Sequence, residues 1–369
     1  MSQEKMGRKK RLLYITNSIS GSGGLERVLS IKLSYLTEEL DYEIYVIVLN
    51  NGDQNPFYEF SEKIVYFSIA VGGNPVKYIL SFKNGIQKIV NELNPDIILV
   101  CDDGLKGFIL PSIINTSAKW IYERHVSKLI EANDSDSVLK KIINKVKWSL
   151  MDFFGSRFDK FVVLTDNNKK EWKSLNNLTV ISNPLSFYPD NKSSLQNKEI
   201  ICVGKISYQK GQDLLLKAWE KISLKYPGWV LKLYGKRDNF FLSVDDLPEG
   251  VLYYPPTNDI ESSYLSSSIY VMSSRFEGFG MVLIEAMACG VPCVSFDCDY
   301  GPSDIIRHGH DGLLVPKGDV HLLESSISSL IEDEKIRREL GGNARESVKR
   351  YQVKNIISEW NSLFNKLLK

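Results

Sequence analysis

The stretch RLLYITNSISGSGGLERVLSIKLSYLTEELDYEIYVIVL, residues 11–49, decides the fold class. Its first part, Arg11 to Asn17, is an apolar run typical of a buried strand, and the glycine-rich turn Gly21 to Gly24 follows it. From Leu25 to Leu40 apolar residues recur at helical spacing, and Glu43 to Leu49 is a second apolar run. A strand, turn, helix and strand in this order predict a βαβ unit with a parallel sheet.

The same alternation continues to the end of the chain, and 369 residues exceed what one hydrophobic core usually organises. The polar stretch Ser186 to Lys198 lacks periodicity and is predicted to be an interdomain linker. We therefore expect two α/β domains, residues 1–186 and 187–354, with 355–369 as a last helix. Strands are predicted at Asp96–Cys101, Lys119–Glu123, Phe161–Thr165, Glu199–Val203, Trp229–Tyr234, Val251–Tyr254, Ile269–Met272 and Val291–Ser295. Helices are predicted at Ile86–Leu93, Gly211–Leu224, from Met281, in two pieces over Val320–Tyr351, and at Asn355–Leu368.

The composition is that of a soluble globular protein. Hydrophobic residues make up 43% and charged residues 25%, and the net charge is only +1, so no overall field favours a nucleic-acid partner. The five cysteines are predicted to be reduced structural thiols, since the cluster Cys289, Cys293 and Cys298 lacks the paired spacing of zinc sites. The basic start leads into an apolar run too short for a signal core or a membrane span, which predicts a cytoplasmic protein.

Residues Val138 to Phe154 predict a basic amphipathic helix, because the apolar positions mostly fit one face and lysines occupy the other. One interpretation is peripheral contact with an anionic membrane, at the inner face of the cell membrane. The other, which we favour because amphipathicity is usual for packed helices, is a surface helix packed on the first domain.

The segment RFEGFGMVLIE, Arg275 to Glu285, carries the strongest chemical pattern. Gly278 and Gly280 let the backbone approach a ligand closely, and the N–H groups of the helix that opens after them favour an anion such as a phosphate. Glu277 and Glu285 bracket the loop and would repel a phosphate, so we interpret them as acceptors for sugar and ribose hydroxyls. Acidic residues placed near a helix N-terminus for dipole reasons are the alternative, which leaves the glycine pair unexplained.

A second loop, GKISYQKG at 204–211, also lies between a predicted strand and a predicted helix. Lys205 and Lys210 flank it and form a credible diphosphate clamp, although lysines in surface loops are common and the loop is not a Walker motif.

The first glycine-rich turn departs from the dinucleotide-binding pattern GxGxxG. Glu26 stands where the third glycine falls, and Leu49 and Asn50 stand where an acidic residue is expected after the second strand. We therefore discount a nicotinamide cofactor.

Several segments together resemble the family 4 glycosyltransferases, which have the GT-B fold. EGFGMVLIEAMACGVP carries the E-x7-E signature of that family with both glutamates present, and the other segments follow in the same order and spacing as in the family. These are GGLERV, SNP at 182–184, VGKISYQKGQDLLLKAW and GPSDIIRHGHDGLLVPKGD. The resemblance implies two Rossmann-like domains facing across a cleft. The C-terminal domain would bind a nucleotide sugar, the N-terminal domain most of the acceptor, and the last helix would cross back to the N-terminal domain.

The resemblance also implies roles for individual residues. Glu285 matches the glutamate that binds ribose, Glu277 the one that holds the transferred sugar, and the pair Lys205 and Lys210 the diphosphate clamp. The family usually has arginine at position 205, and lysine keeps the charge but loses the bidentate fork. The implied donor-binding set is Gly23, Gly24, Lys205, Lys210, Phe279, Gly280, Met281, Val282 and Glu285. The implied catalytic set is Glu277, His125 and Lys210.

The role of His125 stays open at this stage, and the acidic strings require a decision about metal. His125 follows a predicted strand, where the family often places a histidine beside the transferred sugar, but a surface or core histidine fits the sequence equally. The strings Asp102-Asp103 and Asp297-Cys-Asp299 resemble a metal-binding DxD motif. Metal-dependent transferases have another fold, so we interpret both as loop acids and expect no metal and no cofactor.

The implied reaction is transfer of a hexose or N-acetylhexosamine from a nucleotide diphosphate sugar, with UDP preferred by analogy, with retention of configuration. The acceptor is expected to be a saccharide, preferably lipid-linked, in bacterial surface polysaccharide or glycan assembly. A sugar-nucleotide epimerase of the same fold and a catalytically silent sugar-nucleotide-binding subunit are the alternatives. The E-x7-E loop and its SRFEGFG context favour transfer over the epimerase, and intact Glu277, Glu285, Lys205 and Lys210 argue against the silent subunit.

Overall fold

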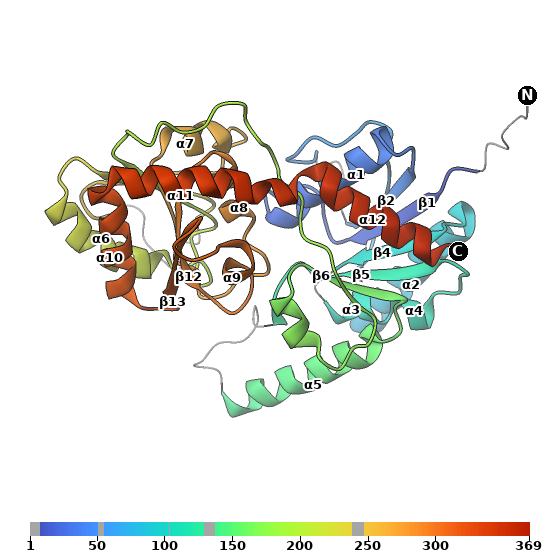
Figure 1. The fold of residues 1–369 in the computed structure, drawn as a ribbon. Helices are drawn as coiled ribbons and strands as arrows, with labels where there is room; N and C mark the ends of the chain where they lie inside the picture. The colour runs from blue at the N-terminus through green and yellow to red at the C-terminus, as the bar shows by residue number, and fades with distance from the viewer. Residues whose placement is uncertain (1–7, 51–54, 103, 129–136, 238–246) are drawn as a thin grey trace, which may run out of the picture. The chain divides into compact units, whose positions relative to one another are not determined.

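The computed structural model describes residues 8–50, 55–102, 104–128, 137–237 and 247–369. The chain divides into two compact units, drawn in Figure 1. Unit 1 holds Met1–Val163, Trp172–Pro184 and Val353–Lys369, and unit 2 holds Leu164–Glu171 and Leu185–Gln352. The end of the chain therefore returns to the first unit.

Unit 1 is built on a seven-stranded parallel sheet in the order β3-β2-β1-β4-β5-β6-β7. The strands are β1 (Arg11–Thr16), β2 (Glu43–Leu49), β3 (Val65–Ile69), β4 (Ile97–Cys101), β5 (Lys119–Glu123), β6 (Lys160–Val163) and β7 (Leu178–Val180). The helices are α1 (Gly24–Glu38), α2 (Pro75–Leu93), α3 (Leu105–Phe108), α4 (Leu110–Ile113), α5 (Val138–Gly155) and α12 (Val353–Leu367).

Unit 2 has a six-stranded parallel sheet in the order β10-β9-β8-β11-β12-β13. The strands are β8 (Glu199–Val203), β9 (Val230–Tyr234), β10 (Val251–Tyr254), β11 (Ile269–Met272), β12 (Cys293–Asp297) and β13 (Gly312–Pro316). The helices are α6 (Gln212–Lys225), α7 (Ile260–Ser266), α8 (Met281–Ala288), α9 (Pro302–Ile305), α10 (Val320–Glu332) and α11 (Glu334–Ser347). Two 3-10 turns, η2 (Asn167–Trp172) and η3 (Val348–Tyr351), complete the described elements.

Both sheets contain a point where the strand order reverses, between β1 and β4 in unit 1 and between β8 and β11 in unit 2. Loops at the carboxyl ends of the two strands diverge there, and open α/β sheets bind ligands in the crevice that this leaves. In unit 2 the loops that leave these two strands are 204–211 and 273–280. They contain the two strongest motifs of the sequence.

The predicted α/β class with parallel sheets is confirmed in both units, while strands β3, β7 and β13 were not predicted. All three lie at or next to a sheet edge, so burial does not force an apolar run on them. Val65 and Tyr66 of β3 are exposed, and β13 begins with a glycine and ends with a proline. Helix α2 begins at Pro75 rather than Ile86, because Asn74 caps its start and its first turns are largely exposed.

Helix α12 is packed into unit 1. Its residues Ile356, Ile357, Trp360, Leu363 and Phe364 are all buried, and Trp360 lies over the ammonium group of Lys32 in α1 at 4.4 Å. The predicted return of the last helix to the N-terminal domain is thereby confirmed.

Helix α5 packs on the core of unit 1 through Met151, Trp148 and Phe154, so the favoured interpretation of a surface helix packed on the first domain is confirmed. Most of its other apolar side chains are exposed, which the sequence did not predict. No helix among the described residues is both long and apolar enough to cross a bilayer.

Candidate active site

The two motif loops of unit 2 lie against each other at the switch point between β8 and β11. The backbone N–H of Arg275 donates to the Gln209 carbonyl oxygen at 2.7 Å, and the hydroxyl of Ser273 donates to the Lys210 carbonyl oxygen at 3.1 Å. Gln209 in turn donates from Nε2 to the Phe276 carbonyl oxygen at 3.3 Å. Two segments more than sixty residues apart in sequence are therefore joined into one surface.

Arg275 stabilises the contact between the two loops. Its guanidinium forms a bidentate pair with Asp213 of α6 at 2.9 and 2.7 Å, donates to the Tyr208 carbonyl oxygen at 2.8 Å, and lies 4.1 Å from the centre of the Tyr208 ring. The hydrogen bond to Asp213 raises the pKa of Arg275 above its ordinary value. Sequence reasoning gave Arg275 no role, because its partner lies 62 positions earlier and no local pattern links the two.

Close approach of the loops requires glycine at position 211. Gly211 caps the start of α6 with a left-handed φ of +64°, and a Cβ there would lie 2.1 Å from the Ser273 carbonyl oxygen. The glycine thus serves the contact between the loops as well as the turn.

Lys210 and Glu277 form the charged centre of this surface. The Lys210 ammonium lies 2.7 Å from Glu277 Oε1, and the Ser274 hydroxyl donates to the same oxygen at 2.6 Å. Glu277 is only 5% exposed. The predicted diphosphate-binding cation and the predicted sugar-binding carboxylate are therefore neighbours, and the ion pair fixes the geometry of both.

Glu285 lies on α8, as the sequence predicts, and is 1% exposed. Its carboxylate accepts hydrogen bonds from the Ser186 hydroxyl at 2.8 Å and the Tyr264 hydroxyl at 3.3 Å. A carboxylate offers about four acceptor positions, so such a group is able to serve a further hydroxyl as well. Sequence reasoning missed Ser186 and Tyr264, which lie far from Glu285 along the chain.

The start of α8 carries the predicted backbone donors. Gly280 precedes the helix with a left-handed φ of +105°, and Met281 and Val282 form its first turn. The first N–H groups of a helix attract anions. Phe279 is 3% exposed, with its ring edge-on to Tyr351 at 5.5 Å, so its side chain anchors the loop.

Lys205 is exposed at the beginning of the first loop. Beside it, the backbone N–H of Gly204 donates to the carbonyl oxygen of Tyr234, the last residue of β9, and that of Ile206 donates to the carbonyl oxygen of Lys236 just after β9. Tyr234 stacks on Tyr254 at 4.7 Å and lines a hollow of about 530 Å³ together with Pro255, Pro256, Thr257, Asp259, Ser262, Ser263 and Ser266. A hollow with stacked tyrosines thus adjoins the loop 204–211, and no sequence motif predicted it.

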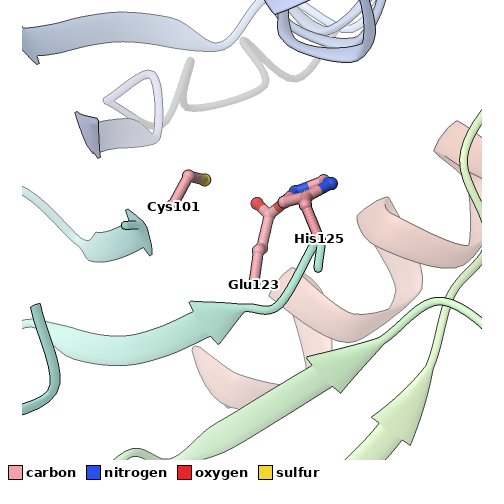
Figure 2. A group of neighbouring side chains, drawn as sticks. All are labelled: Cys101, Glu123 and His125. Carbon is pink, nitrogen blue, oxygen red and sulfur yellow. The ribbon is translucent and has the colours of Figure 1, made fainter. Parts of the chain in front are cut away.

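In unit 1 the structure gathers a buried polar group at the carboxyl ends of β4 and β5 (Figure 2). The Nε2 atom of His125 lies 3.2 Å from Glu123 Oε2, and the Lys32 ammonium lies 2.5 Å from the same oxygen. The His125 side chain is 7% exposed, so a surface histidine is excluded. Among the described residues, its Nδ1 atom has no hydrogen-bond partner.

The charge on Glu123 is set by its neighbours. Burial raises the pKa of this carboxyl, but Lys32 and His125 together outweigh burial and lower the pKa below its ordinary value. Cys101 lies close to Glu123 and His125, and their ligand atoms fall within 4.8 Å of one another, as they would around a metal ion. Because Lys32 already neutralises the carboxylate, a divalent cation there would meet a buried positive charge. We interpret the group as a positioning network for His125.

Gly23 is the N-cap of α1, and Gly24 is its first residue. Glu26 folds back over this turn, so that a Cβ on Gly21 or Gly23 would lie 2.3 or 2.6 Å from its carboxylate oxygens. A carboxylate in this position would repel a pyrophosphate, so the turn is unsuited to bind one as a dinucleotide-binding turn does.

The remaining sequence candidates are the cysteines and the acids of the two DxD-like strings. All five cysteines are buried and outside disulfides, and burial raises the pKa of Cys202 and of Cys289 to about 12. Asp102 is buried beside Lys106 at 3.5 Å, and Asp299 pairs with Lys317 at 2.9 Å. Asp103 lies outside the described residues.

Comparison with known proteins agrees with this geometry. The model of the family described as Glycosyl transferases group 1 matches residues 188–347. An uncharacterized glycosyltransferase of Haemophilus influenzae is 30% identical over 96% of this chain and 99% of its own. The amylovoran biosynthesis glycosyltransferase AmsD of Erwinia amylovora is 28% identical over 96% and 99%. A solved structure of S. aureus TarM, in complex with fondaparinux, α-GlcNAc-glycerol and UDP, has a TM-score of 0.78 at 15% identity and covers 96% of this chain and 100% of its own.

The fold and the paired loops therefore define an enzyme of the GT-B class, a glycosyltransferase. The chain belongs to the group 1 glycosyltransferases.

Replacing Gly211 tests the contact between the loops. Gly211→Ala is expected to lower the free energy of unfolding of unit 2 by more than the ~1–3 kcal/mol of left-handed strain alone, because the new Cβ also clashes with the Ser273 carbonyl. Gly228→Ala is the matched control, since Gly228 has a φ of +88° but a Cβ there would meet only the Lys198 side chain, at 3.9 Å. Urea unfolding of both variants measures the difference, and equal losses would show that the loops are not in contact.

The buried pair Lys32 and Glu123 is tested by removing one charge and then both. Glu123→Gln leaves a buried ammonium unpaired and is expected to cost about 3–5 kcal/mol, most of which the double variant Lys32→Met/Glu123→Gln should regain. Because the pKa of Glu123 is lowered, the contribution of the pair is complete above the ordinary carboxyl pKa and is lost as pH falls through the folded-state pKa. Unfolding measured at a series of acidic pH values should therefore show a steeper loss for the wild type than for the double variant. Parallel losses would contradict the ion pair.

Proposed function

We propose that this glycosyltransferase is a retaining enzyme of family 4 that takes its sugar, a hexose or N-acetylhexosamine, from a UDP-sugar. The observation that carries the proposal is the ion pair of Lys210 and Glu277 at the junction of two glycine-rich loops. A nucleotide sugar presents a diphosphate directly beside a ring of hydroxyls. A cation and a helix N-terminus suit the diphosphate, and a carboxylate directly beside them suits the hydroxyls of the sugar.

In this proposal each group has a separate role. Lys210 keeps one donor on Glu277 and offers its others to the diphosphate, with Lys205 as the second cation. The N–H groups of residues 280–282 bind phosphate oxygen, and Glu277 accepts from hydroxyls of the transferred sugar. Glu285 accepts from the ribose and shares its carboxylate with Ser186.

The hollow lined by Tyr234 and Tyr254 is the proposed place of the base. It adjoins the first loop through hydrogen bonds of β9, and aromatic rings stack on bases. The solved relative in complex with UDP supports a uridine nucleotide as the donor's leaving group.

In the proposed reaction, the bond between the anomeric carbon and the diphosphate oxygen breaks, and the leaving UDP keeps the electron pair. The acceptor hydroxyl forms the new bond on the same face, and its proton passes to the leaving phosphate oxygen. Lys205, Lys210 and the α8 N-terminus stabilise the charge that develops on the diphosphate. The step uses no carboxylate base, and we propose that it needs neither a metal nor another cofactor.

The proposed acceptor is a saccharide, preferably lipid-linked, in the assembly of a surface polysaccharide or glycan. Support comes from the amylovoran biosynthesis relative of Erwinia amylovora and from the poly(ribitol-phosphate) α-N-acetylglucosaminyltransferase of Staphylococcus aureus, which is 24% identical over 76% of this chain. A lipid-linked acceptor would bring the enzyme to the inner membrane surface. The roles expected for Gly23, Gly24 and His125 toward the donor stay predictions.

If Lys210 and Glu277 have these roles, replacing either residue should reduce sugar transfer and leave the protein folded. Lys210→Ala and Glu277→Gln are each expected to lower kcat/KM about 100-fold or more, because each removes a group that stabilises the transition state. Lys217→Ala, which changes an exposed lysine of α6 in the same unit, is the control. If both site variants transfer sugar at the wild-type rate in a stably folded protein, the site is misassigned.

The donor and the stereochemistry are tested together. The enzyme is incubated with UDP-, GDP- and ADP-linked sugars, with and without lipid-diphosphate saccharides, and nucleotide release and the anomeric configuration of the product are measured. We expect acceptor-dependent release of UDP, retention of configuration, and the same rate after treatment with a chelator. Epimerised nucleotide sugar, or binding without release, would instead identify the epimerase or the silent binding subunit.

A further inference from the structure

His125 follows β5 and is the least buried member of the polar group in Figure 2. Cys101 and Glu123 are buried, whereas His125 is partly exposed as a whole residue, although its side chain is only 7% exposed. Ligands of open parallel sheets bind at the carboxyl edge of the strands, where this group lies. The histidine is thus the member of the group that a ligand can approach.

One nitrogen of the imidazole ring is committed to Glu123. The Nε2 atom of His125 lies 3.2 Å from Glu123 Oε2, the oxygen with which the Lys32 ammonium pairs. The lowered pKa of Glu123 keeps this carboxyl ionised at neutral pH. A carboxylate only accepts hydrogen bonds, so the hydrogen of the imidazole lies on Nε2. Because Lys32 already balances the charge of Glu123, a neutral imidazole leaves the buried group without excess charge.

The other ring nitrogen, Nδ1, is therefore a buried acceptor. A neutral imidazole has one N–H, so Nδ1 carries a lone pair and no hydrogen. It has no hydrogen-bond partner among the residues that the structure describes, and Figure 2 shows the second ring nitrogen turned away from Glu123 and Cys101. Buried polar atoms are nearly always paired, so an unpaired acceptor beside a ligand-binding edge points to a partner on a ligand.

Two further contacts hold Lys32 in place. Its ammonium lies 5.1 Å from the centre of the Tyr14 ring in β1 and 4.4 Å from the centre of the Trp360 ring in α12. The side chains of Lys32 and Glu123 are 1% and 2% exposed. Since β1, α1, β5 and α12 all contribute to this arrangement, the carboxylate has little freedom to turn away from His125.

We propose that Glu123, held by Lys32, is a positioning residue that fixes His125 in the tautomer with its hydrogen on Nε2, so that Nδ1 accepts a hydrogen bond from a sugar hydroxyl. A hydroxyl has a hydrogen to donate, whereas a phosphate oxygen only accepts and finds no hydrogen on Nδ1. The network thus favours the sugar part of a substrate over its phosphates. Both the transferred sugar and the acceptor saccharide carry hydroxyls, and the test below separates them.

The inference deepens the proposed function and rests on it for the source of the hydroxyl. The tautomer of His125, in contrast, is a property of the enzyme without substrate. Its measurement therefore stands whether or not the proposed donor is correct.

The tautomer is tested by nitrogen NMR of the full-length enzyme labelled in its histidines. The chain has four histidines, and the signals of His125 are those that disappear in His125→Asn. We expect a hydrogen on Nε2 and none on Nδ1 at neutral pH. His308 is an internal reference, because its Nδ1 atom accepts from the Leu314 backbone N–H at 3.0 Å. A hydrogen on Nδ1 of His125 would overturn the inference.

The positioning role is tested in Lys32→Met/Glu123→Gln, which leaves no member of the ion pair unpaired. A glutamine amide both donates and accepts, so it no longer holds the ring in one tautomer. We expect both tautomers in the NMR signals and a KM for one sugar substrate that is roughly three- to tenfold higher, with kcat largely kept. Lys63→Met/Glu38→Gln, which removes an exposed ion pair of unit 1, is the control. Unchanged KM values for both substrates would show that the buried pair is only structural.

His125→Asn and His125→Gln distinguish the two ring nitrogens. The asparagine carbonyl oxygen can replace Nδ1 as an acceptor, whereas the longer glutamine reaches toward the position of Nε2. His125→Asn should therefore have the lower KM for the substrate whose hydroxyl binds, and equal KM values would contradict the acceptor role. A KM effect on the nucleotide sugar assigns the hydroxyl to the transferred sugar, and an effect on the saccharide assigns it to the acceptor.

Binding of UDP alone, measured by calorimetry, should be the same in the wild type and in all of these variants, because UDP lacks the sugar. A loss of UDP affinity as large as the rise in KM would contradict a contact with a sugar hydroxyl. A wild type that transfers no sugar from any nucleotide sugar would refute the proposed function, and the NMR measurement would still decide the positioning role of Glu123.

Discussion

The contact between the loops after β8 and β11 is the constraint on which the candidate site depends. Two parallel strands that lie side by side, but whose connections leave in opposite directions, bring their following loops together. The ion pair of Arg275 with Asp213 and the left-handed backbone of Gly211 then hold those loops at contact distance. Only in that arrangement do Lys210 and Glu277, 67 residues apart, form a partly buried pair beside the N-terminus of α8.

In unit 1, distant elements are held together by a buried charge. Lys32 lies between Glu123 and the ring of Trp360, so α1, β5 and the C-terminal helix converge on one ammonium group. Burying a charge is costly unless it is paired, and here the pair also orients the imidazole of His125. The end of the chain is thus tied, through Trp360, to the polar group at the carboxyl edge of the first sheet.

Much of the architecture could be predicted because the central strands of parallel sheets are buried on both faces and must be apolar. Arg11–Thr16, Glu43–Leu49 and Ile97–Cys101 stand out for this reason. Edge strands such as Val65–Ile69 and Gly312–Pro316 need not be buried on both faces, so their sequences show no clear apolar run. The motif residues were also visible from the sequence, since Lys210, Glu277 and Gly280 lie in glycine-rich loops between a strand and a helix and Glu285 completes the E-x7-E spacing. The partners Asp213, Ser186 and Tyr264 were not, because each acts across a fold that brings distant segments together.

By itself, the sequence determined the α/β class, the two series of strands and helices, and the loops that carry the glycines and charges, because each follows from local spacing and residue type. Only the tertiary structure decided which of these residues meet and which faces are buried. Helix α5 shows the reason most directly. Periodicity reveals that a helix has an apolar side and a basic side, but which side meets the protein depends on neighbours elsewhere in the chain. For α5 the core of unit 1 packs against Met151, Trp148 and Phe154, and most of the other apolar side chains are exposed.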